Sequence, residues 1–261
     1  MNQLLDFTIV TEQGGEPVSR AQLERFHQRY IWAGSYCNGR DTLEMACGTG
    51  PGLGYLRRQA RSLVAGDVSP SVLALARGHY GDRVDLREFD AARTPFADTS
   101  VDVIILFEAI YYLPDLEAFA REVRRLLRPR GVLLLATANK DLPDFNPSPF
   151  SQTYLSAPEL RAWLGRHGFA CTFFGGSPVP KAGARAKLLR TIKRLAVSLH
   201  LIPDSMRGKR LLKRLVFGKL VTMPLELSVE DALFVPPVSI DPDLPDTTHQ
   251  VLYCVAEKIG P

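Results

Sequence analysis

A glycine-rich turn stands near residue 50 of this sequence, just after an acidic residue. Residues 43–52 read LEMACGTGPG, so glycines at 48, 50 and 52 follow a short run that is typical of a β-strand. Glycines in such a turn allow positive φ angles and let a ligand approach the backbone without meeting a Cβ atom. Dinucleotide-binding turns follow the pattern G-x-G-x-x-G, and counted from Gly48 the third glycine would fall on Leu53. The spacing therefore indicates a cofactor-binding turn but disfavours NAD.

Two carboxylates accompany this turn. Asp67 lies 19 residues beyond Gly48, at the end of a second apolar run, where a carboxylate can accept hydrogen bonds from both hydroxyls of a ribose. Glu44 precedes Gly48 by four residues, and we expect it beneath the turn, where it can order the turn and accept a hydrogen bond from a cofactor ammonium group. Together these residues predict a nucleoside-containing cofactor.

Metal and disulfide chemistry find no support in the sequence. The four cysteines, at positions 37, 47, 171 and 254, form no C-x-x-C motif, and no two histidines have the spacing of metal ligands. We therefore expect no metal site and reduced, mostly buried thiols. The first ten residues lack the basic stretch of a secretory signal, and no window reaches about 18 consecutive apolar residues. We expect a cytoplasmic protein without a membrane span, and contact with the inner membrane surface stays an alternative.

The elements that must position these residues follow from the apolar pattern. Strands and helices alternate with short connections, which predicts an α/β fold with a doubly wound parallel sheet. The chain has 261 residues, of which 46% are hydrophobic and 23% charged, and this suits one large domain. The seven predicted strands cover residues 41–46, 62–67, 83–89, 101–107, 131–138, 169–174 and 249–257. The predicted helices among them cover residues 19–36, 53–61, 71–79, 116–127 and 157–167.

Positive charge concentrates in one region of the chain. Residues 181–219 hold twelve Lys and Arg against one acid, an excess larger than the net charge of +4 of the whole chain. Two basic amphipathic helices are predicted there, over 184–201 and 207–221. Three interpretations stay open for this region: a solvated charged face, an amphipathic element that contacts anionic lipid, or a nucleic-acid surface. The last is disfavoured because Phe217 alone interleaves the cations there.

We therefore divide the single domain into four parts. Residues 1–40 form an N-terminal helical segment, and residues 41–176 form the cofactor-binding core. Residues 177–246 form a basic helical insertion or cap, and residues 247–261 carry the final strand.

Four motifs give the sequence a family resemblance. LEMACGTGPG, GDVSPSVLALAR, FDAARTPFADTSVDVIILFEAIYYLPD and LLRPRGVLLLATAN occur in this order over about residues 40–140. The segment resembles the class I S-adenosylmethionine-dependent methyltransferases, in particular the subgroup with a ubiquinone/menaquinone-type methyltransferase domain. The resemblance implies a seven-strand Rossmann-like sheet with an antiparallel last strand, S-adenosylmethionine as the cofactor, and methyl transfer as the reaction.

The resemblance also implies roles for individual residues. Glu44, Gly48 and Gly50 would hold the methionine portion of the cofactor. Asp67 and Val68 would hold the ribose and the edge of the adenine. Asp90 and Ala91 would lie at the adenine amino group, Phe107 near the sulfonium, and Tyr30 with Arg29 over the cofactor carboxylate.

The acceptor side of the site is less defined. Candidates for contact with the acceptor are Glu108, Tyr111, Tyr112 and Tyr154. Relatives often have two histidines where this chain has Tyr111 and Tyr112, so a histidine base at that place is unsupported. The catalytic residue stays open, with Glu108 and Tyr111 as candidates.

The residues after the fourth predicted strand disfavour one class of acceptor. Residues 107–110 read FEAI, whereas enzymes that methylate the amino groups of nucleic-acid bases have an Asn/Asp-Pro-Pro-Tyr/Phe motif there. We therefore expect methyl transfer to an oxygen or nitrogen of a small molecule or carbohydrate, free or linked to a lipid, in a biosynthetic reaction. The alternatives are an RNA methyltransferase and a non-catalytic cofactor-binding module. The sequence does not define the oligomeric state.

Overall fold

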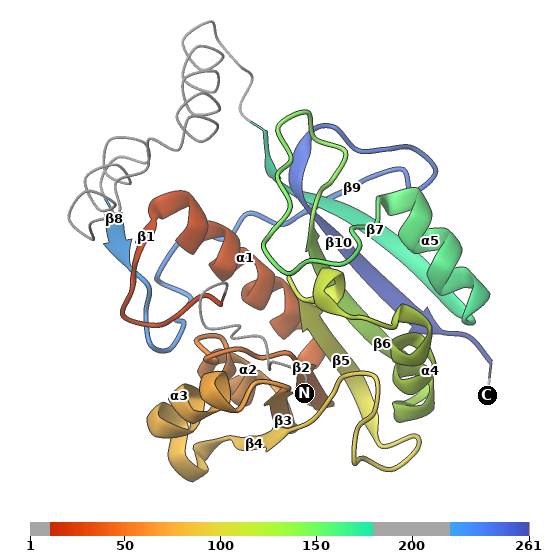
Figure 1. The fold of residues 1–261 in the computed structure, drawn as a ribbon. Coiled ribbons are helices and arrows are strands. Elements are labelled where there is room, and N and C mark those ends of the chain that lie inside the picture. The colour runs from red at the N-terminus through yellow and green to blue at the C-terminus, as the bar shows by residue number, and fades with distance from the viewer. Residues whose placement is uncertain (1–10, 180–219, 261) are drawn as a thin grey trace, which may run out of the picture.

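The computed structural model describes residues 11–179 and 220–260, and shows helices packed on both faces of a central sheet (Figure 1). The strands are β1 (Pro17–Ser19), β2 (Asp41–Met45), β3 (Ser62–Asp67), β4 (Asp85–Glu88), β5 (Val101–Phe107), β6 (Leu127–Ala138), β7 (Phe169–Pro178), β8 (Leu220–Thr222), β9 (Val238–Ser239) and β10 (His249–Lys258). The helices are α1 (Arg20–Cys37), α2 (Leu53–Gln59), α3 (Pro70–Tyr80), α4 (Leu116–Leu126) and α5 (Ala157–Arg166), with 3₁₀ turns at Gly81–Arg83 and Ile110–Tyr112.

The sheet has the strand order β4-β3-β2-β5-β6-β10-β7-β9. The pairs from β4 to β6 are parallel, and β10 is antiparallel to both β6 and β7. The α/β fold class, the seven predicted strands and the antiparallel last strand are confirmed. The strand order reverses between β2 and β5, and in open α/β sheets ligands bind at the carboxyl ends of the strands beside such a reversal.

Two details differ from the sequence-based expectation. The two-residue strand β9 adds an eighth strand at the edge of the sheet, next to β7. Strands β1 and β8 form a separate antiparallel pair, so residues 220 and 221 belong to a strand and not to the end of the second basic helix. The remainder of the two predicted basic helices, over 184–201 and 207–219, lies outside the described residues.

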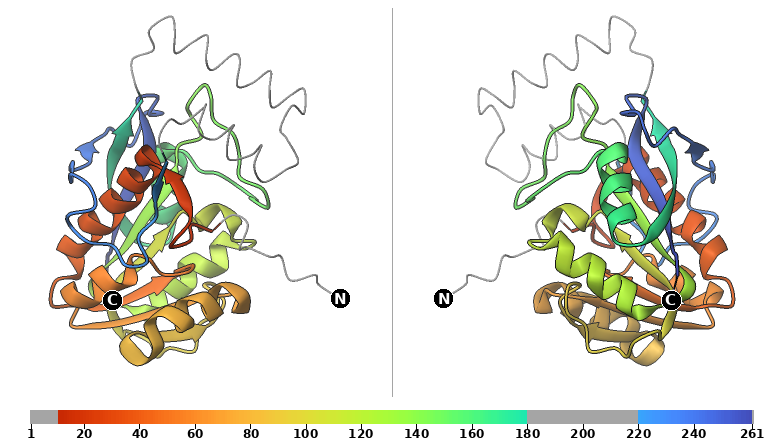
Figure 2. Two further views of the ribbon diagram at one scale, coloured as in Figure 1. Left: turned by 90° about the vertical axis from the view of Figure 1, so that its left-hand side faces the viewer. Right: turned by 90° about the vertical axis from the view of Figure 1, so that its right-hand side faces the viewer.

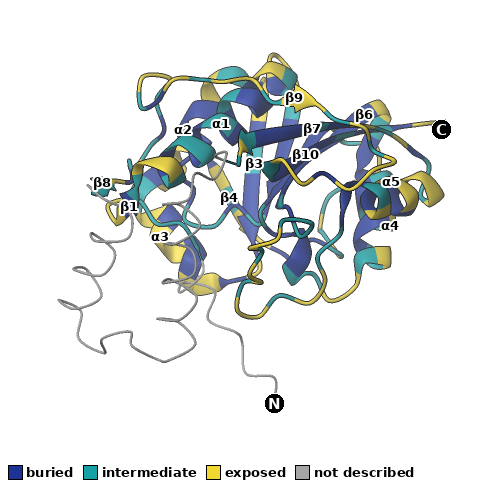
Figure 3. Cartoon of the chain, turned by 90° about the horizontal axis from the view of Figure 1, so that it is seen from above, coloured by how far each residue is buried: buried dark blue, intermediate teal, exposed yellow. Residues whose placement is uncertain are grey.

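The helices cover the sheet in two layers. Side chains of α1, α2 and α3 pack on one face, and those of α4 and α5 pack on the other; the side views of Figure 2 show α1 and α4 on opposite sides of the sheet. Strand β5 explains why the central strands read as continuous apolar runs. Val103 and Ile105 belong to the first core and Ile104 and Leu106 to the second, so both faces of the strand are buried. Exposed positions concentrate on loops and outer helix faces (Figure 3).

Helix α1 is fixed at its first turn, ahead of the sheet. The Ser19 hydroxyl accepts a hydrogen bond from the Gln22 backbone N–H at 3.1 Å, which satisfies one of the free N–H groups of the first turn. The chain before β1 is bound to the chain after β8, because Gly15 N–H donates to the Met223 carbonyl and Met223 N–H donates to the Glu16 carbonyl.

Within the described residues, no helix has both the length and the apolar character needed to cross a bilayer.

Candidate functional site

A cavity of about 1540 Å³ opens at the carboxyl ends of the parallel strands, beside the strand-order reversal. It is bordered by segments that are far apart in the sequence, including the chain before β1, helix α1 and the start of β10. Eleven of the predicted site residues line it: Arg29, Tyr30, Gly48, Asp67, Val68, Asp90, Ala91, Phe107, Glu108, Tyr111 and Tyr112. The other three, Glu44, Gly50 and Tyr154, do not.

The glycine turn after β2 has the backbone that the sequence predicts. Gly48 and Gly50 have φ angles of +61° and +79°, a region that L side chains rarely adopt. A Cβ atom on Gly48 would come within 2.8 Å of Thr11 Cγ2, so the chain before β1 lies directly against the turn. The turn thus offers bare backbone to the cavity at this point, and a side chain at residue 48 would have to displace Thr11.

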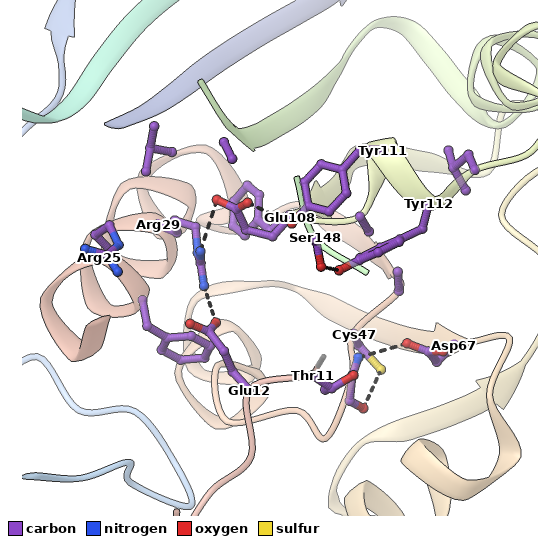
Figure 4. A pocket seen from close by; sticks show the side chains of 18 of the residues that line it. Thr11, Glu12, Arg25, Arg29, Cys47, Asp67, Glu108, Tyr111, Tyr112 and Ser148 are labelled. Atoms are coloured by element: carbon purple, nitrogen blue, oxygen red, sulfur yellow. Dashed lines mark hydrogen bonds and ion pairs between the residues drawn. The ribbon is translucent and has the colours of Figure 1, made fainter. Parts of the chain in front are cut away.

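Asp67 joins this turn to the end of β3. Its Oδ2 atom accepts a hydrogen bond from Gly48 N–H at 3.1 Å, and its Oδ1 atom accepts one from Ser69 N–H at 2.9 Å. Burial raises the pKa of Asp67, and the two backbone donors oppose that shift. A carboxylate has about four lone-pair positions, so two backbone donors leave room for ligand hydroxyls. Figure 4 shows Asp67 beside the glycine turn, at one end of the cavity.

The next two strand ends supply an exposed carboxylate and an aromatic wall. Asp90 follows β4 and is exposed, and its Oδ1 atom accepts a hydrogen bond from Ala92 N–H at 2.8 Å. Phe107, the last residue of β5, meets the ring of Tyr30 edge to face at 5.5 Å between centroids. The cavity therefore combines a polar end near β3 and β4 with an aromatic wall at β5.

Glu44 lies beneath the turn, as predicted, but it does not line the cavity. It is 1% exposed, and its Oε1 atom accepts a hydrogen bond from the Tyr30 hydroxyl at 2.6 Å. Its Oε2 atom is buried with no hydrogen-bond partner among the described residues. Burial raises the pKa of Glu44 to about 8, although the Tyr30 hydrogen bond and the charge of Arg29 both lower it. Tyr30, which does line the cavity, therefore links Glu44 to it.

An ion-pair chain that the sequence did not predict crosses the cavity. The guanidinium of Arg29 pairs with Glu12 on one side and with Glu108 Oε1, at 3.2 Å, on the other (Figure 4). Burial lowers the pKa of Arg29, but these two carboxylates outweigh burial and hold the pKa above its usual value. The Glu12 carbonyl also accepts a hydrogen bond from the Thr49 hydroxyl at 2.9 Å. No local motif marks Glu12, because its place depends on the pairing of β1 with β8.

The acceptor candidates surround Glu108, directly after β5. Glu108 has a φ angle of +50°, and its Oε2 atom accepts a hydrogen bond from the Tyr111 hydroxyl at 3.1 Å. Burial raises the pKa of Glu108 more than the charge of Arg29 lowers it. The Tyr112 hydroxyl is hydrogen-bonded to the Ser148 hydroxyl at 2.5 Å. Tyr154 stacks on Tyr111 at 4.4 Å between centroids, so it supports that ring from outside the cavity.

The residues present fit a sulfonium nucleoside. The bare backbone at Gly48 admits close approach, and Asp67 and Asp90 offer acceptors to hydroxyl and amino groups at adjacent strand ends. Aromatic rings of Tyr30 and Phe107 border the space between these acceptors and Glu108. Within the described ranges, no three His, Cys, Asp or Glu side chains gather in a way that could hold a metal ion.

The comparisons with known proteins agree with this geometry. Residues 43–135 match a family described as a methyltransferase domain. A probable S-adenosylmethionine-dependent methyltransferase of Mycolicibacterium smegmatis is 38% identical over 139 residues, which cover 51% of this chain and 53% of that protein. A phthiotriol/phenolphthiotriol dimycocerosates methyltransferase of Mycobacterium ulcerans is 37% identical over 100 residues, which cover 37% of each chain.

A solved structure extends the similarity of fold. The crystal structure of an S-adenosylmethionine-dependent methyltransferase from Archaeoglobus fulgidus superposes with a TM-score of 0.57 at 13% identity, covering 92% of this chain and 95% of that one. The chain spans about half the length of the Mycolicibacterium relative. The family match starts within β2 and ends within β6, so it covers the glycine turn and the ends of β3, β4 and β5 but not β10. Residues 43–135 therefore match a methyltransferase domain, the described sheet has the Rossmann-like fold of the Archaeoglobus structure, and the similar proteins indicate S-adenosylmethionine as the cofactor.

Proposed function

We propose that this protein transfers the methyl group of S-adenosylmethionine to an oxygen or nitrogen atom of a small molecule or carbohydrate, free or linked to a lipid. The observation that carries the proposal is the meeting of Gly48, Asp67, Asp90 and Phe107 in one cavity, from the ends of four different strands. Beyond these residues the same cavity continues past Glu108 and Tyr111, which leaves space for a second substrate. The name of the Mycobacterium ulcerans relative describes a triol derivative, which supports a hydroxyl acceptor here.

The proposed cofactor contacts are divided among the strand ends. Asp67 and Val68 hold the ribose and the adenine edge, and Asp90 with Ala91 lies at the adenine amino group. The turn at Gly48 and Gly50 holds the methionine portion, with Glu44 acting through Tyr30. Arg29 and Phe107 border the methionine carboxylate and the sulfonium.

The reaction depends on alignment of the acceptor with the methyl group and on exclusion of water, and it does not need covalent catalysis. The bound cofactor would supply a methyl group attached to a positively charged sulfur, which leaves when the acceptor atom attacks that methyl group in line. The chain positions the acceptor and excludes water with the rings of Tyr30, Phe107 and Tyr111. Glu108 takes the proton when the acceptor is a hydroxyl or an ammonium group, and its raised pKa brings it nearer to neutral pH, where a general base is most effective.

Glu108→Gln tests this role. We expect kcat to fall by about 10²-fold or more, the lower end of the usual contribution of a general base, while the affinity for S-adenosylhomocysteine stays within about threefold. In the wild type, kcat/KM should rise with pH through the raised pKa of Glu108, since only the ionised carboxylate accepts a proton. The variant should lose this rise. An unchanged pH profile would assign the base elsewhere.

The methyltransferase proposal itself is tested by binding and by transfer. Calorimetry should detect S-adenosylmethionine and S-adenosylhomocysteine but not NAD. Extracts incubated with the protein and methyl-labelled cofactor should yield a labelled small molecule or glycan. Label in RNA, or nucleic acid that copurifies and dissociates steeply with salt, would favour the RNA methyltransferase. Tight cofactor binding without transfer to any extract would favour a non-catalytic module.

We further propose that residues 1–261 act as one domain in which residues 177–246 select the acceptor. Val179 lines the cavity where the chain leaves β7, and β8 pairs with β1 just ahead of α1. The insertion therefore begins beside the cavity, and its strand β8 lies next to the strand that precedes α1. The positive charge of residues 181–219 supports contact of a cytoplasmic protein with the anionic inner membrane surface, and co-sedimentation with phosphatidylglycerol vesicles but not with phosphatidylcholine vesicles would support it.

A further inference from the structure

Helix α1 presents one face to the cavity. Gln22, Arg25, Phe26, Arg29 and Tyr30 all line it, at the three- and four-residue spacing that places side chains on the same side of a helix. Two arginines one turn apart therefore point toward the same space (Figure 4). They differ in what neutralises them.

Arg29 has two paired carboxylates, whereas Arg25 has no ion-pair partner among the described residues. Arg29 pairs with both Glu12 and Glu108. Arg25 Nη1 donates a hydrogen bond to Gln250 Oε1 at 3.2 Å, and in the described part of the chain no carboxylate lies within ion-pair distance of it. Burial and the positive charge of Arg29 lower the pKa of Arg25, and the more distant Glu12 and Glu108 do not offset this. Within the described residues, Arg25 is therefore left without a paired carboxylate, and the more distant Glu12 and Glu108 neutralise it only in part.

The position of Arg25 separates it from the proposed contacts at the glycine turn and of the nucleoside, while Arg29, a proposed contact of the methionine carboxylate, lies one turn along the same helix. Its partner Gln250 lies on β10, which is three strands away from β2 in the sheet order. With about 4.8 Å between neighbouring strands, that is roughly 14 Å from the glycine turn. Asp67 and Asp90 lie farther still, at β3 and β4, and Figure 4 shows Arg25 and Asp67 at opposite ends of the cavity. A group bound by Arg25 therefore belongs to the second substrate.

We infer that the methyl acceptor carries an anionic group, a carboxylate or a phosphate, that is bound by the guanidinium of Arg25 together with the side-chain amide of Gln250. A guanidinium donates two parallel hydrogen bonds to such a group, and its planar fork matches the geometry of both anions. Gln250 lines the cavity, and its amide nitrogen adds a neutral donor beside the cation. This inference rests on the proposed methyl transfer and narrows the class of its acceptor.

Fractionation of extracts tests the charge of the acceptor. Water-soluble and lipid extracts are each separated on an anion exchanger into bound and unbound fractions, and each fraction is incubated with the protein and methyl-labelled cofactor. We expect labelled product from a bound fraction. Product from unbound fractions alone overturns the inference but keeps the proposed function. Absence of product from every fraction contradicts the proposed function itself.

Two treatments of the active fraction distinguish the anions. Phosphodiesterase together with phosphatase should abolish methylation if the group is a phosphate, and carbodiimide-driven amidation should abolish it if the group is a carboxylate. Methylation that survives both treatments counts against either anion as the group that Arg25 binds.

Variants connect the anion to Arg25. Arg25→Gln should raise KM for the acceptor in the active fraction about 10-fold or more, since hydrogen bonds to charged groups are strong, with kcat nearly unchanged. Arg25→Lys should raise this KM by a smaller factor, because lysine keeps the positive charge but lacks the planar, two-pronged guanidinium. Arg20→Gln is the control, because Arg20 lies on the same helix but pairs with Glu24 in solvent. If Arg25→Gln weakens S-adenosylhomocysteine binding to the same extent, Arg25 binds the cofactor carboxylate and the inference is wrong.

Discussion

At the scale of single residues, the candidate site depends on carboxyl groups that fix the backbone or a neighbouring side chain of the cavity wall. Asp67 fixes the position of Gly48 through one oxygen and of Ser69 through the other. Glu44 fixes the Tyr30 hydroxyl from beneath the turn. Each carboxylate shapes the cavity before any ligand arrives, so less of the binding free energy goes into ordering the site.

Asp67→Ala is expected to weaken S-adenosylhomocysteine binding by about 10-fold or more, because hydrogen bonds to a charged acceptor contribute roughly 1.5–3 kcal/mol. Asp67→Asn keeps one oxygen for the backbone donors and removes the charge, so it separates loss of the ligand contact from loss of the turn. Isothermal titration calorimetry measures the affinity of each variant for S-adenosylhomocysteine. Unchanged affinity in both variants would remove Asp67 from the site.

The raised pKa of Glu44 predicts a pH dependence of stability. An unfolded Glu releases its proton near pH 4.5, whereas Glu44 in the folded protein keeps it up to about pH 8. Between these values the folded state binds more protons than the unfolded state, so the free energy of unfolding must fall as pH rises. Urea unfolding from pH 5 to 8.5 should show a shallower fall for Glu44→Gln, which keeps an oxygen for the Tyr30 hydroxyl. Equal slopes for the two proteins would contradict this assignment.

At the scale of elements, the crossing of α1 over the first turn of α2 sets the wall of the site. Gly52 precedes α2, and a Cβ atom there would come within 2.1 Å of Tyr30 Cε1. The Tyr30 ring cannot move away easily, because it contacts Phe26 and Phe107 and its hydroxyl is bound to Glu44. The glycine at 52 thus serves helix packing, whereas the glycine at 48 serves the turn.

Gly52→Ala should therefore destabilise the protein by about 1–3 kcal/mol, the usual cost of overpacking a core, and should also weaken cofactor binding by displacing Tyr30. Gly78→Ala is the matched control. Gly78 lies on the exposed side of α3 with nothing within 4 Å of a Cβ atom, so alanine there should stabilise the helix by roughly 0.5–1 kcal/mol. Urea unfolding of both variants measures the difference. Equal free energies of unfolding for the two variants would show that the Tyr30 ring can move aside to accommodate a methyl group at residue 52.

At the scale of the whole molecule, the proposed sites of the two substrates lie at the ends of different strands of the sheet. The proposed cofactor contacts lie at the ends of β2, β3, β4 and β5, and the Arg25–Gln250 pair lies at β10, on the other side of β6. The insertion between β7 and β10 leaves from this second half, at Val179. Changes in the insertion should therefore affect acceptor selection without affecting cofactor binding.

Removing residues 181–219, with a short linker from residue 180 to 220, tests this separation. We expect cofactor affinity within about threefold of the full chain, because the strand ends that hold the cofactor stay intact. We expect acceptor turnover to be lost. Calorimetry and label transfer measure the two properties, and turnover that survives the deletion would show that the insertion does not select the acceptor.

The sequence by itself determined the strand and helix pattern and most of the proposed cofactor half of the cavity. These features are local, because a glycine turn must follow β2 and Asp67 must end β3 whatever the rest of the chain does. Only the tertiary structure decided the acceptor half. Arg25 and Gln250 are 225 residues apart and meet because β10 inserts between β6 and β7. Glu12 lies in the chain ahead of the β1–β8 pair and forms an ion pair with Arg29, and the Tyr154 ring packs against the Tyr111 ring. Contacts of this kind depend on strand order and side-chain packing, which no short stretch of sequence encodes.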